Sequence, residues 1–327
     1  MNLSKRDFLG FGAAAGASLA LPTWAQGKPL FDTLNMFVPA APGGGWDGTA
    51  RAIERAAKAA GLVGNMAFEN VGGAGGMVGL PRFVNQRKGQ ANTLMVGGSV
   101  MIGAGIANKS PITIKDVTPI ARLTEEAGVI VVPASGKIKT WKELEAAIKA
   151  NPKAVSVAGG SAGGTDHLIL GMLIKALGKS PREAAYVAFA GGGPANAALL
   201  GNQVVAGISG YSEFEEQIKG GKMIPLAVSG KSRLPALPNV PTLAEAGVNT
   251  SVSSFGGLSV PAGTPAPIVA KIADALQKAM THPKAKERME GIGGQFTPGS
   301  GAELTESFRQ EIPLTEAMMR AAKLEAQ

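Results

Sequence analysis

Short runs of apolar residues alternate with amphipathic helical runs along most of the chain. This alternation predicts an α/β fold in which mostly parallel sheets are flanked by helices. A Thr140–Glu143 capping box marks the start of one helix, and helical segments are expected from residue 266 to the end. The predicted strands cover residues 34–38, 66–69, 93–96, 128–133, 154–158, 186–189, 203–208, 224–228 and 253–260.

A unit of strand, glycine-rich loop and helix recurs at least four times, around residues 43, 73, 161 and 192. In open α/β sheets, ligands bind at the carboxyl ends of the strands. Helix N-termini at that edge present unpaired N–H groups and a partial positive charge, which favour anions. Glycine lets a ligand approach the backbone closely. The repeated unit therefore predicts loops that clamp an anion.

The pattern changes near residue 120, and a proline-rich stretch at 235–241 precedes the last predicted strand. We interpret residues 28–125 plus 253–327 as one lobe and residues 126–252 as a second, inserted lobe. The chain would then cross twice between two lobes with a ligand cleft between them. Two crossings predict a hinge, and a ligand would stabilise the closed state.

The N-terminus has the order of an export signal over residues 1–25. Lys5 and Arg6 precede an uncharged, weakly apolar stretch at 8–21, and small residues lead to Ala25. Cleavage there would start the mature chain at Gln26 and place it in the periplasm. The segment is similar to a twin-arginine signal with Lys5 in place of the first arginine, so the twin-arginine and general secretory routes both stay open.

The composition of the chain argues against several kinds of site and partner. The chain has no cysteine and only two histidines, His167 and His282, which excludes disulfides, thiol catalysis and a histidine-rich metal site. The net charge is +8, but the basic residues are scattered and only 5% of residues are aromatic. That distribution argues against nucleic-acid binding. We therefore expect no cofactor, no metal and no nucleic-acid partner.

Two motifs suggest other functions. The glycines of Gly43-x-Gly45-x-x-Gly48, with Glu69 about twenty residues on, match a dinucleotide fingerprint. A lone fingerprint in a chain with 46 glycines is weak evidence. Ser161 lies in a Gly-x-Ser-x-Gly nucleophile elbow with His282 downstream, which makes an exported serine esterase the alternative function. No His-Gly oxyanion loop accompanies that elbow.

Four side chains near these loops have competing interpretations. Asp47 is either a helix cap or a ligand contact. Trp46 packs on the lobe surface or faces the cleft, where an aromatic would form a ligand wall. Tyr211 belongs to the core or the cleft, and we favour the cleft. His167 lies in the first turn of its helix, where a structural hydrogen bond is the more common role.

The glycine-rich loops, taken in order, resemble those of the solute-binding receptors of tripartite tricarboxylate transporters, also called Bug-type receptors. The matching segments extend over most of the chain after the export signal. Each is weak alone, but the ordered set is specific. They are Val38-Pro-Ala-Ala-Pro-Gly-Gly-Gly-Trp-Asp47, Glu69-Asn-Val-Gly-Gly-Ala-Gly-Gly76, Pro119-Ile-Ala-Arg122, Gly160-Ser-Ala-Gly-Gly-Thr-Asp-His-Leu168, Val187-Ala-Phe-Ala-Gly-Gly-Gly-Pro-Ala195 and Val240-Pro-Thr-Leu243.

The resemblance implies a monomeric two-lobe receptor rather than an enzyme, with no catalytic residue. It would capture a small di- or tricarboxylate and deliver it to integral-membrane transporter subunits. In the family, contacts come from the first glycine-rich loop and from the loop before the inserted lobe's helix. Together with the neighbouring glycine-rich loops and strand ends, the predicted ligand-binding residues are Gly44, Gly45, Trp46, Asp47, Gly75, Ser99, Ser161, Gly164, Thr165, Asp166, Gly192 and Tyr211.

Overall fold

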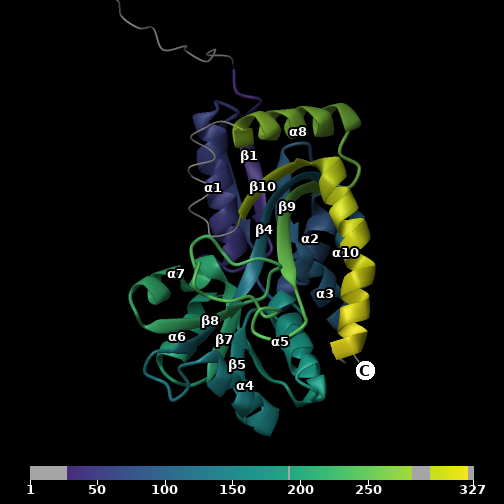
Figure 1. The fold of residues 1–327 in the computed structure, drawn as a ribbon. Helices are drawn as coiled ribbons and strands as arrows, with labels where there is room; N and C mark the ends of the chain where they lie inside the picture. The colour runs from purple at the N-terminus through teal and green to yellow at the C-terminus, as the bar shows by residue number, and fades with distance from the viewer. Residues whose placement is uncertain (1–27, 191, 282–294, 323–327) are drawn as a thin grey trace, which may run out of the picture.

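The computed structural model describes residues 28–190, 192–281 and 295–322 (Figure 1). The predicted export signal and His282 lie outside these residues. The first elements are β1 (Phe31–Val38), α1 (Gly45–Ala59), β2 (Val63–Asn70), α2 (Gly79–Gln86), β3 (Thr93–Gly98) and α3 (Ser99–Ala107). The middle elements are β4 (Val117–Pro133), α4 (Trp141–Ala150), β5 (Ser156–Gly159), α5 (Thr165–Ala176), β6 (Ala185–Ala188), α6 (Gly192–Leu200), β7 (Ala206–Gly210), α7 (Tyr211–Lys219) and β8 (Met223–Val228). The last elements are β9 (Ser253–Pro261), α8 (Ala266–Thr281), β10 (Gln295–Ser300) and α10 (Gly301–Ala322).

The strands form a mixed sheet in the order β2-β1-β3-β9-β4-β7-β5-β6, and β8 and β10 also pair with β4. The outer pairs, β1 with β2 and β3 and β5 with β6 and β7, are parallel, as the glycine-loop units predict. The pairs that involve β4 or β9 are antiparallel.

β4 joins the two halves of the sheet. The strand is 17 residues long, and its first part pairs with β9 and β10 while its last part pairs with β7 and β8. One continuous strand therefore belongs to both halves, and β9 returns the chain alongside it (Figure 1).

Each half of the sheet has hydrophobic clusters on both faces. In the first half, α1 and α8 cover one face, and α2, α3 and α10 cover the other. In the second half, α4 and α5 contribute to one cluster, and α6 and α7 to the other. Burial of these helix faces stabilises each half around its own core. The helices do not cover the strand ends and the following loops where the two halves of the sheet meet.

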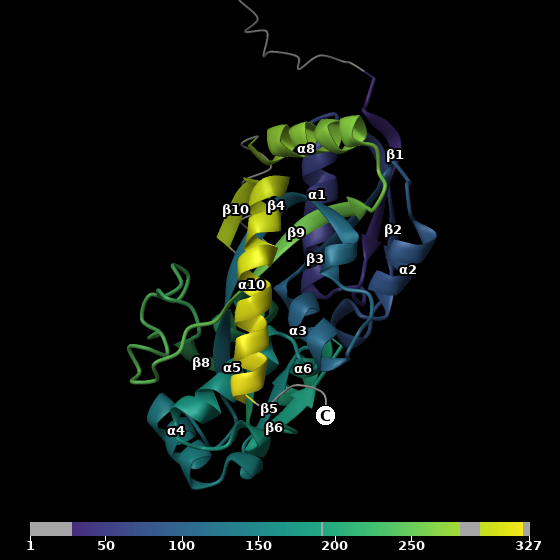
Figure 2. The ribbon, with the colours of Figure 1, turned by 90° about the vertical axis from the view of Figure 1, so that its right-hand side faces the viewer.

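Helix α10 reaches along both halves (Figure 2). Leu304 and Phe308 pack in a first-half cluster, and the Phe308 ring lies 5.3 Å from that of Phe255. Further along the helix, Met318 packs against the α4–α5 cluster of the second half. Pro313, inside the helix, lies between these two contact regions.

Two features of this sheet differ from the sequence prediction. Residues 295–300 form the strand β10, so the expectation of helices alone after residue 266 is wrong there. Pro298 and Gly299 obscure that strand in the sequence, and both are tolerated because β10, among the described strands, pairs with β4 alone and through a bulge. β4 also begins at Val117, eleven residues before the predicted start at 128, because its polar first part is stabilised by pairing with β9 and β10 rather than by an apolar run.

Candidate functional site

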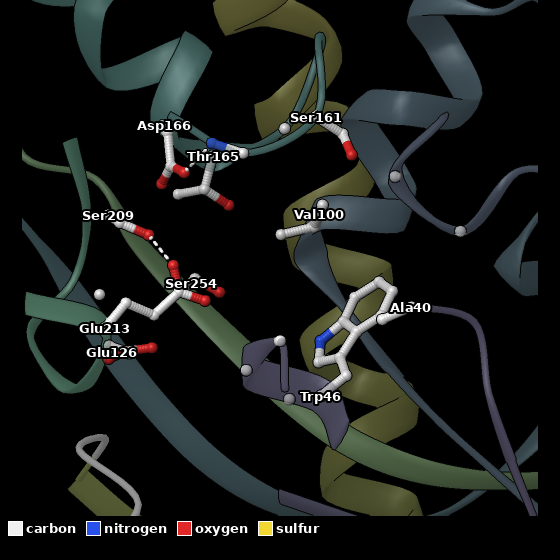
Figure 3. A pocket seen from close by; sticks show the side chains of 18 of the residues that line it. Ala40, Trp46, Val100, Glu126, Ser161, Thr165, Asp166, Ser209, Glu213 and Ser254 are labelled. Carbon is white, nitrogen blue, oxygen red and sulfur yellow. Dashed lines mark hydrogen bonds between the residues drawn. The ribbon is translucent and has the colours of Figure 1, made fainter. Parts of the chain in front are cut away.

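A cavity of about 190 Å³ lies where the two halves of the sheet meet (Figure 3). It is lined by the loops after β1, β2, β5 and β7 and by the start of β9, with β4 crossing its floor. The carboxyl ends of strands from both halves therefore face one space. This is the edge at which open α/β sheets bind ligands.

Three helices begin at the cavity with glycine N-caps. Gly44 precedes α1, Gly164 precedes α5 and Gly210 precedes α7, and none of these caps supplies a side-chain hydrogen bond. All three glycines line the cavity. The first N–H groups of a helix have no partner within it, and the helix dipole adds about half a positive charge there. The N-termini of α1 and α5 therefore make a site for an anion, whereas α7 donates its Ser212 N–H to the carboxyl group of Glu126.

Side chains complete the wall between these N-termini. The hydroxyls of Ser161 and Thr165 lie on one side of the cavity, and the Trp46 ring lies on another (Figure 3). Val100 and Phe255 add apolar surface. Thr165 is buried in the protein but accessible from this space, so its hydroxyl is available to a solute.

The two halves touch through glycines beside the cavity. A Cβ on Gly103 of α3 would lie 2.2 Å from the carbonyl oxygen of Gly163 in the loop before α5. Gly75, at a φ of 63°, lies opposite Ser161, and an added Cβ would lie 3.5 Å from the Ser161 Cβ. The approach at Gly103 leaves no space for any other residue type, so glycine is what lets the halves come this close.

Asp47 supports the first loop from within the protein. Its Oδ2 accepts hydrogen bonds from the Gly43 N–H and the Arg51 Nε, both at 3.0 Å, and its Oδ1 accepts one from Asn70 at 3.0 Å. Burial raises the pKa of Asp47, but these bonds and the Arg51 charge outweigh burial and leave the pKa below its ordinary value. The carboxylate is 3% exposed and does not line the cavity.

Three other carboxyl groups do line the cavity, and we call Glu126, Asp166 and Glu213 the acidic wall. Burial, reinforced by the Glu213 charge and opposed by a 2.8 Å bond from the Gly160 N–H, raises the pKa of Asp166 to about 7. Burial, with the charges of Glu213 and Asp166, raises the pKa of Glu126 to about 8. Glu213 accepts a 2.6 Å bond from Ser209.

Most of the predicted site residues line this cavity, and three of those that the structure describes do not. Ser99 accepts a hydrogen bond from the Phe255 N–H at 3.0 Å and bonds to the Ser254 hydroxyl. Tyr211 is 7% exposed and packs in the α6–α7 cluster, so its side chain lies in the core rather than in the cleft that we expected. Asp47 is buried beneath the loop. Gly192 begins α6, and its surroundings lie outside the part of the chain that the structure describes. The predicted residues that line the cavity are Gly44, Gly45, Trp46, Gly75, Ser161, Gly164, Thr165 and Asp166.

The sequence analysis missed one side of the site. Ser209, Glu213 and Glu126 line the cavity, as do Ser212 and Ser254. The segment from Ser209 to Glu213 is another strand–glycine–helix unit, but a single glycine marks it instead of a glycine-rich run. Glu126 stands at the predicted lobe crossing. An acidic residue at a predicted hinge was the available signal.

The described residues give Ser161 no catalytic partner. No hydrogen bond to its hydroxyl is found among them, and the positive φ of this loop belongs to Gly163, whereas an elbow serine sits on a strained turn. His167 accepts the Gly163 N–H at 3.1 Å and stacks on Tyr186, as predicted for a structural histidine. His282, the proposed base, lies outside the described residues.

The acidic residue of the dinucleotide fingerprint is occupied by ion pairs. Glu69, at the position expected to bind a ribose, is paired with Arg87 and lies 3.7 Å from Arg82. Within the described part of the chain, no group of three or more His, Cys, Asp or Glu is arranged to hold a metal ion. No helix in that part is both long and apolar enough to cross a membrane.

Comparison with known proteins identifies the relatives of this chain. The model of the family described as "Tripartite tricarboxylate transporter family receptor" matches residues 50–315. The "UPF0065 protein in the TAR-I ttuE-ttuC' intergenic region" of Agrobacterium vitis is 29% identical over 314 residues, covering 93% of this chain and 89% of that protein.

Two solved structures share the fold. The periplasmic binding protein BugD superposes with a TM-score of 0.81 at 27% identity, covering 90% of this chain and 99% of that one. MatC from Rhodopseudomonas palustris with bound malate gives a TM-score of 0.77 at 27% identity, covering 89% of this chain and 99% of that one. The two-lobe architecture is therefore that of periplasmic binding proteins.

Proposed function

Because the chain belongs to the tripartite tricarboxylate transporter receptor family, we propose that it is a periplasmic solute-binding protein that delivers a small carboxylate to membrane subunits of such a transporter. The observation that carries this proposal is the convergence of the N-termini of α1 and α5, both preceded by a glycine N-cap, on one cavity between the lobes. The malate complex of MatC supports carboxylate recognition.

Backbone donors would hold the carboxylate. No lysine, arginine or histidine lines the cavity among the described residues, so the N–H groups at the starts of α1 and α5 are the principal source of positive potential. The Thr165 hydroxyl adds a side-chain donor. A hydrogen bond to a charged group contributes about 1.5–3 kcal/mol, so two or three such bonds give useful affinity.

Closure follows from the way the chain crosses between the lobes. Rotation of one lobe about β4 and the start of β9 would open the cavity, and solute contacts made from both lobes would favour the closed population. A membrane transporter would then recognise the closed form. Small-angle scattering should show a smaller radius of gyration at saturating solute than without it.

Calorimetry of the mature protein against mono-, di- and tricarboxylates tests the proposal. The amide of the tightest-binding carboxylate should bind at least about tenfold more weakly, since a charge-assisted bond is lost. Equal binding of acid and amide would contradict the anion site, and no binding of any carboxylate would contradict the function. Intact mass of protein from a periplasmic fraction should show a chain that begins at Gln26.

A further inference from the structure

The charge of the cavity is one-sided. The acidic wall contributes three carboxyl groups, from β4, α5 and α7, and the lining contains no basic side chain among the described residues. Glu213 reaches across the junction, because a Cβ on Gly45 would lie 3.4 Å from its Oε1. The acidic wall therefore faces the first helix N-terminus across the space where a solute binds.

Local structural roles account for only part of the acidic wall. Asp166 and Glu213 lie in first helical turns, where acids are favourable, and each uses one oxygen for a local bond. In the described residues, Oδ1 of Asp166 and Oε1 of Glu213 accept no hydrogen bond. Glu126 lies on β4, but its carboxyl group reaches the N-terminus of α7, where it accepts a hydrogen bond from the Ser212 backbone N–H and a long one, at 3.4 Å, from the Ser212 hydroxyl.

A solute with only negative groups fits this wall poorly. A second carboxylate placed there would meet like charges in a partly desolvated space, which is unfavourable. A positively charged nitrogen placed there would instead supply the counter-charge that the wall lacks. Because no described His, Cys, Asp or Glu group has a metal-binding arrangement, an organic cation suits the wall better than a metal ion.

We propose that the solute is a zwitterion, a small carboxylate that also carries an ammonium or quaternary ammonium group. Its carboxylate would lie at the helix N-termini that follow Gly44 and Gly164, and its cationic group at the acidic wall. This inference rests on the proposed function and narrows the solute class. It departs from the di- or tricarboxylate that the sequence predicts.

The protonation of the wall supplies a second test. In the absence of a cation, the pKa values of Asp166 and Glu126 are raised to about 7 and 8, mainly by burial. Tyr186 on β6 faces Asp166, and burial raises its pKa well above the ordinary value, so it stays neutral. Glu126 also lines a second groove, so the charged groups of that groove face it too. These groups are Lys231, Glu311 and Arg122, and Arg122 is paired with Glu125 at 2.8 Å. A bound cation favours the charged carboxylates, so zwitterion affinity should rise from pH 6 to pH 9.

Matched solutes isolate the cationic group. Glycine betaine and 3,3-dimethylbutyrate have the same shape, and only the first carries a positive charge. The pairs 4-aminobutyrate and pentanoate, and L-aspartate and 2-methylsuccinate, make the same comparison in other shapes. In calorimetry at pH 8, the cationic member of at least one pair should bind at least about tenfold more tightly.

The outcomes separate the two proposals. If succinate, malate or citrate binds at least as tightly as every zwitterion, the inference is overturned and the proposed function stands. If the affinity for such a di- or tricarboxylate falls between pH 6 and pH 9, the acidic wall acts as a protonated hydrogen-bond donor, which also overturns the inference. If no carboxylate binds, both proposals fail.

Substitutions in the acidic wall test whether these carboxyl groups bind the cationic group of the solute. Asp166→Asn and Glu213→Gln keep an acceptor for Gly160 and Ser209 but remove the charge, so each should weaken the preferred zwitterion about tenfold and leave the analogue without a cationic group unchanged. Glu216→Gln is the control, because Glu216 is exposed on α7 and does not line the cavity. Equal weakening of both members of a pair would show a structural role only and contradict the inference.

Discussion

Asp47 and Asp166 occupy matching positions in the two halves of the molecule, yet their surroundings differ. Each lies in the first turn of a helix that follows a strand and a glycine-rich loop. Each accepts a hydrogen bond from a glycine N–H of its own loop, Gly43 or Gly160. Asp47 is also bonded to Arg51, whereas Asp166 has the charges of Glu213 and Glu126 nearby.

The difference shows that the motif fixes the position of an acid but not its role. Arg51 stands four residues after Asp47, on the same helix face, and the corresponding residue after Asp166 is Leu170. One aspartate is therefore neutralised within its own helix and holds a loop. The other keeps an uncompensated carboxyl group at the cavity, where a solute can meet it.

The sharpest way to break this comparison is Asp47→Ala. The change leaves the Gly43 N–H, Asn70 and Arg51 without their acceptor, so the free energy of unfolding should fall by about 3 kcal/mol at pH 7.5 in urea denaturation. Glu54→Ala is the control, because its pair with Lys58 lies on the exposed face of the same helix and should matter by about 0.5 kcal/mol or less. Equal losses would show that Asp47 does not hold the loop.

Gly103→Ala tests whether the two halves meet as closely as described. The new methyl group would collide with the Gly163 carbonyl oxygen, so solute affinity should fall about thirtyfold, or about 2 kcal/mol, in calorimetry. Alanine favours the helix over glycine, so the ligand-free protein should keep its stability. Gly105→Ala on the same helix is the control, since its Cβ meets only Met77 Sδ at 3.6 Å. Unchanged affinity in Gly103→Ala would contradict closure through this contact.

Thr165→Val sharpens the assignment of donors at the start of α5. The substitution keeps the shape and removes the hydroxyl that faces the cavity, so binding should weaken by about 1.5 kcal/mol, or about tenfold. Thr165→Ser keeps the hydroxyl and should bind nearly as well as the wild type. Calorimetry in which both variants behave alike would exclude a role for the hydroxyl.

The smallest effect concerns the ligand-free stability of the second half. The pKa of Asp166 is raised from 3.8 to about 7, so the folded state holds its proton more tightly than the unfolded chain does. The protonated Asp166 therefore contributes most to the free energy of unfolding below pH 4, and this contribution is lost as the pH rises to about 7. Asp166→Asn should therefore raise the free energy of unfolding by about 1 kcal/mol at pH 8 and by less at pH 5. A larger gain at pH 5, measured by urea denaturation, would contradict the raised pKa.

Local signals in the sequence predict much of this structure. The glycine-rich loops between apolar runs and helices locate most of the cavity, and the Thr140–Glu143 capping box is confirmed at the start of α4. The features missed depend on distant partners. β10 exists because β4 pairs with it, and Tyr211 turns into the α6–α7 cluster although its loop reaches the cavity. Glu126 comes close to Asp166 only through the crossing of β4, which no local pattern records.

Helix α10 has a consequence for the order in which the protein can fold. It follows every described strand of the sheet along the chain, yet it supplies Phe308 to a cluster of the first half and Met318 to one of the second. Neither half can complete its core until this helix has been synthesised. Pro313 lacks the N–H of an ordinary helical residue, so the helix bends most easily between the two contacts. Chains that end at residue 300 should therefore show raised protease sensitivity in both halves at once.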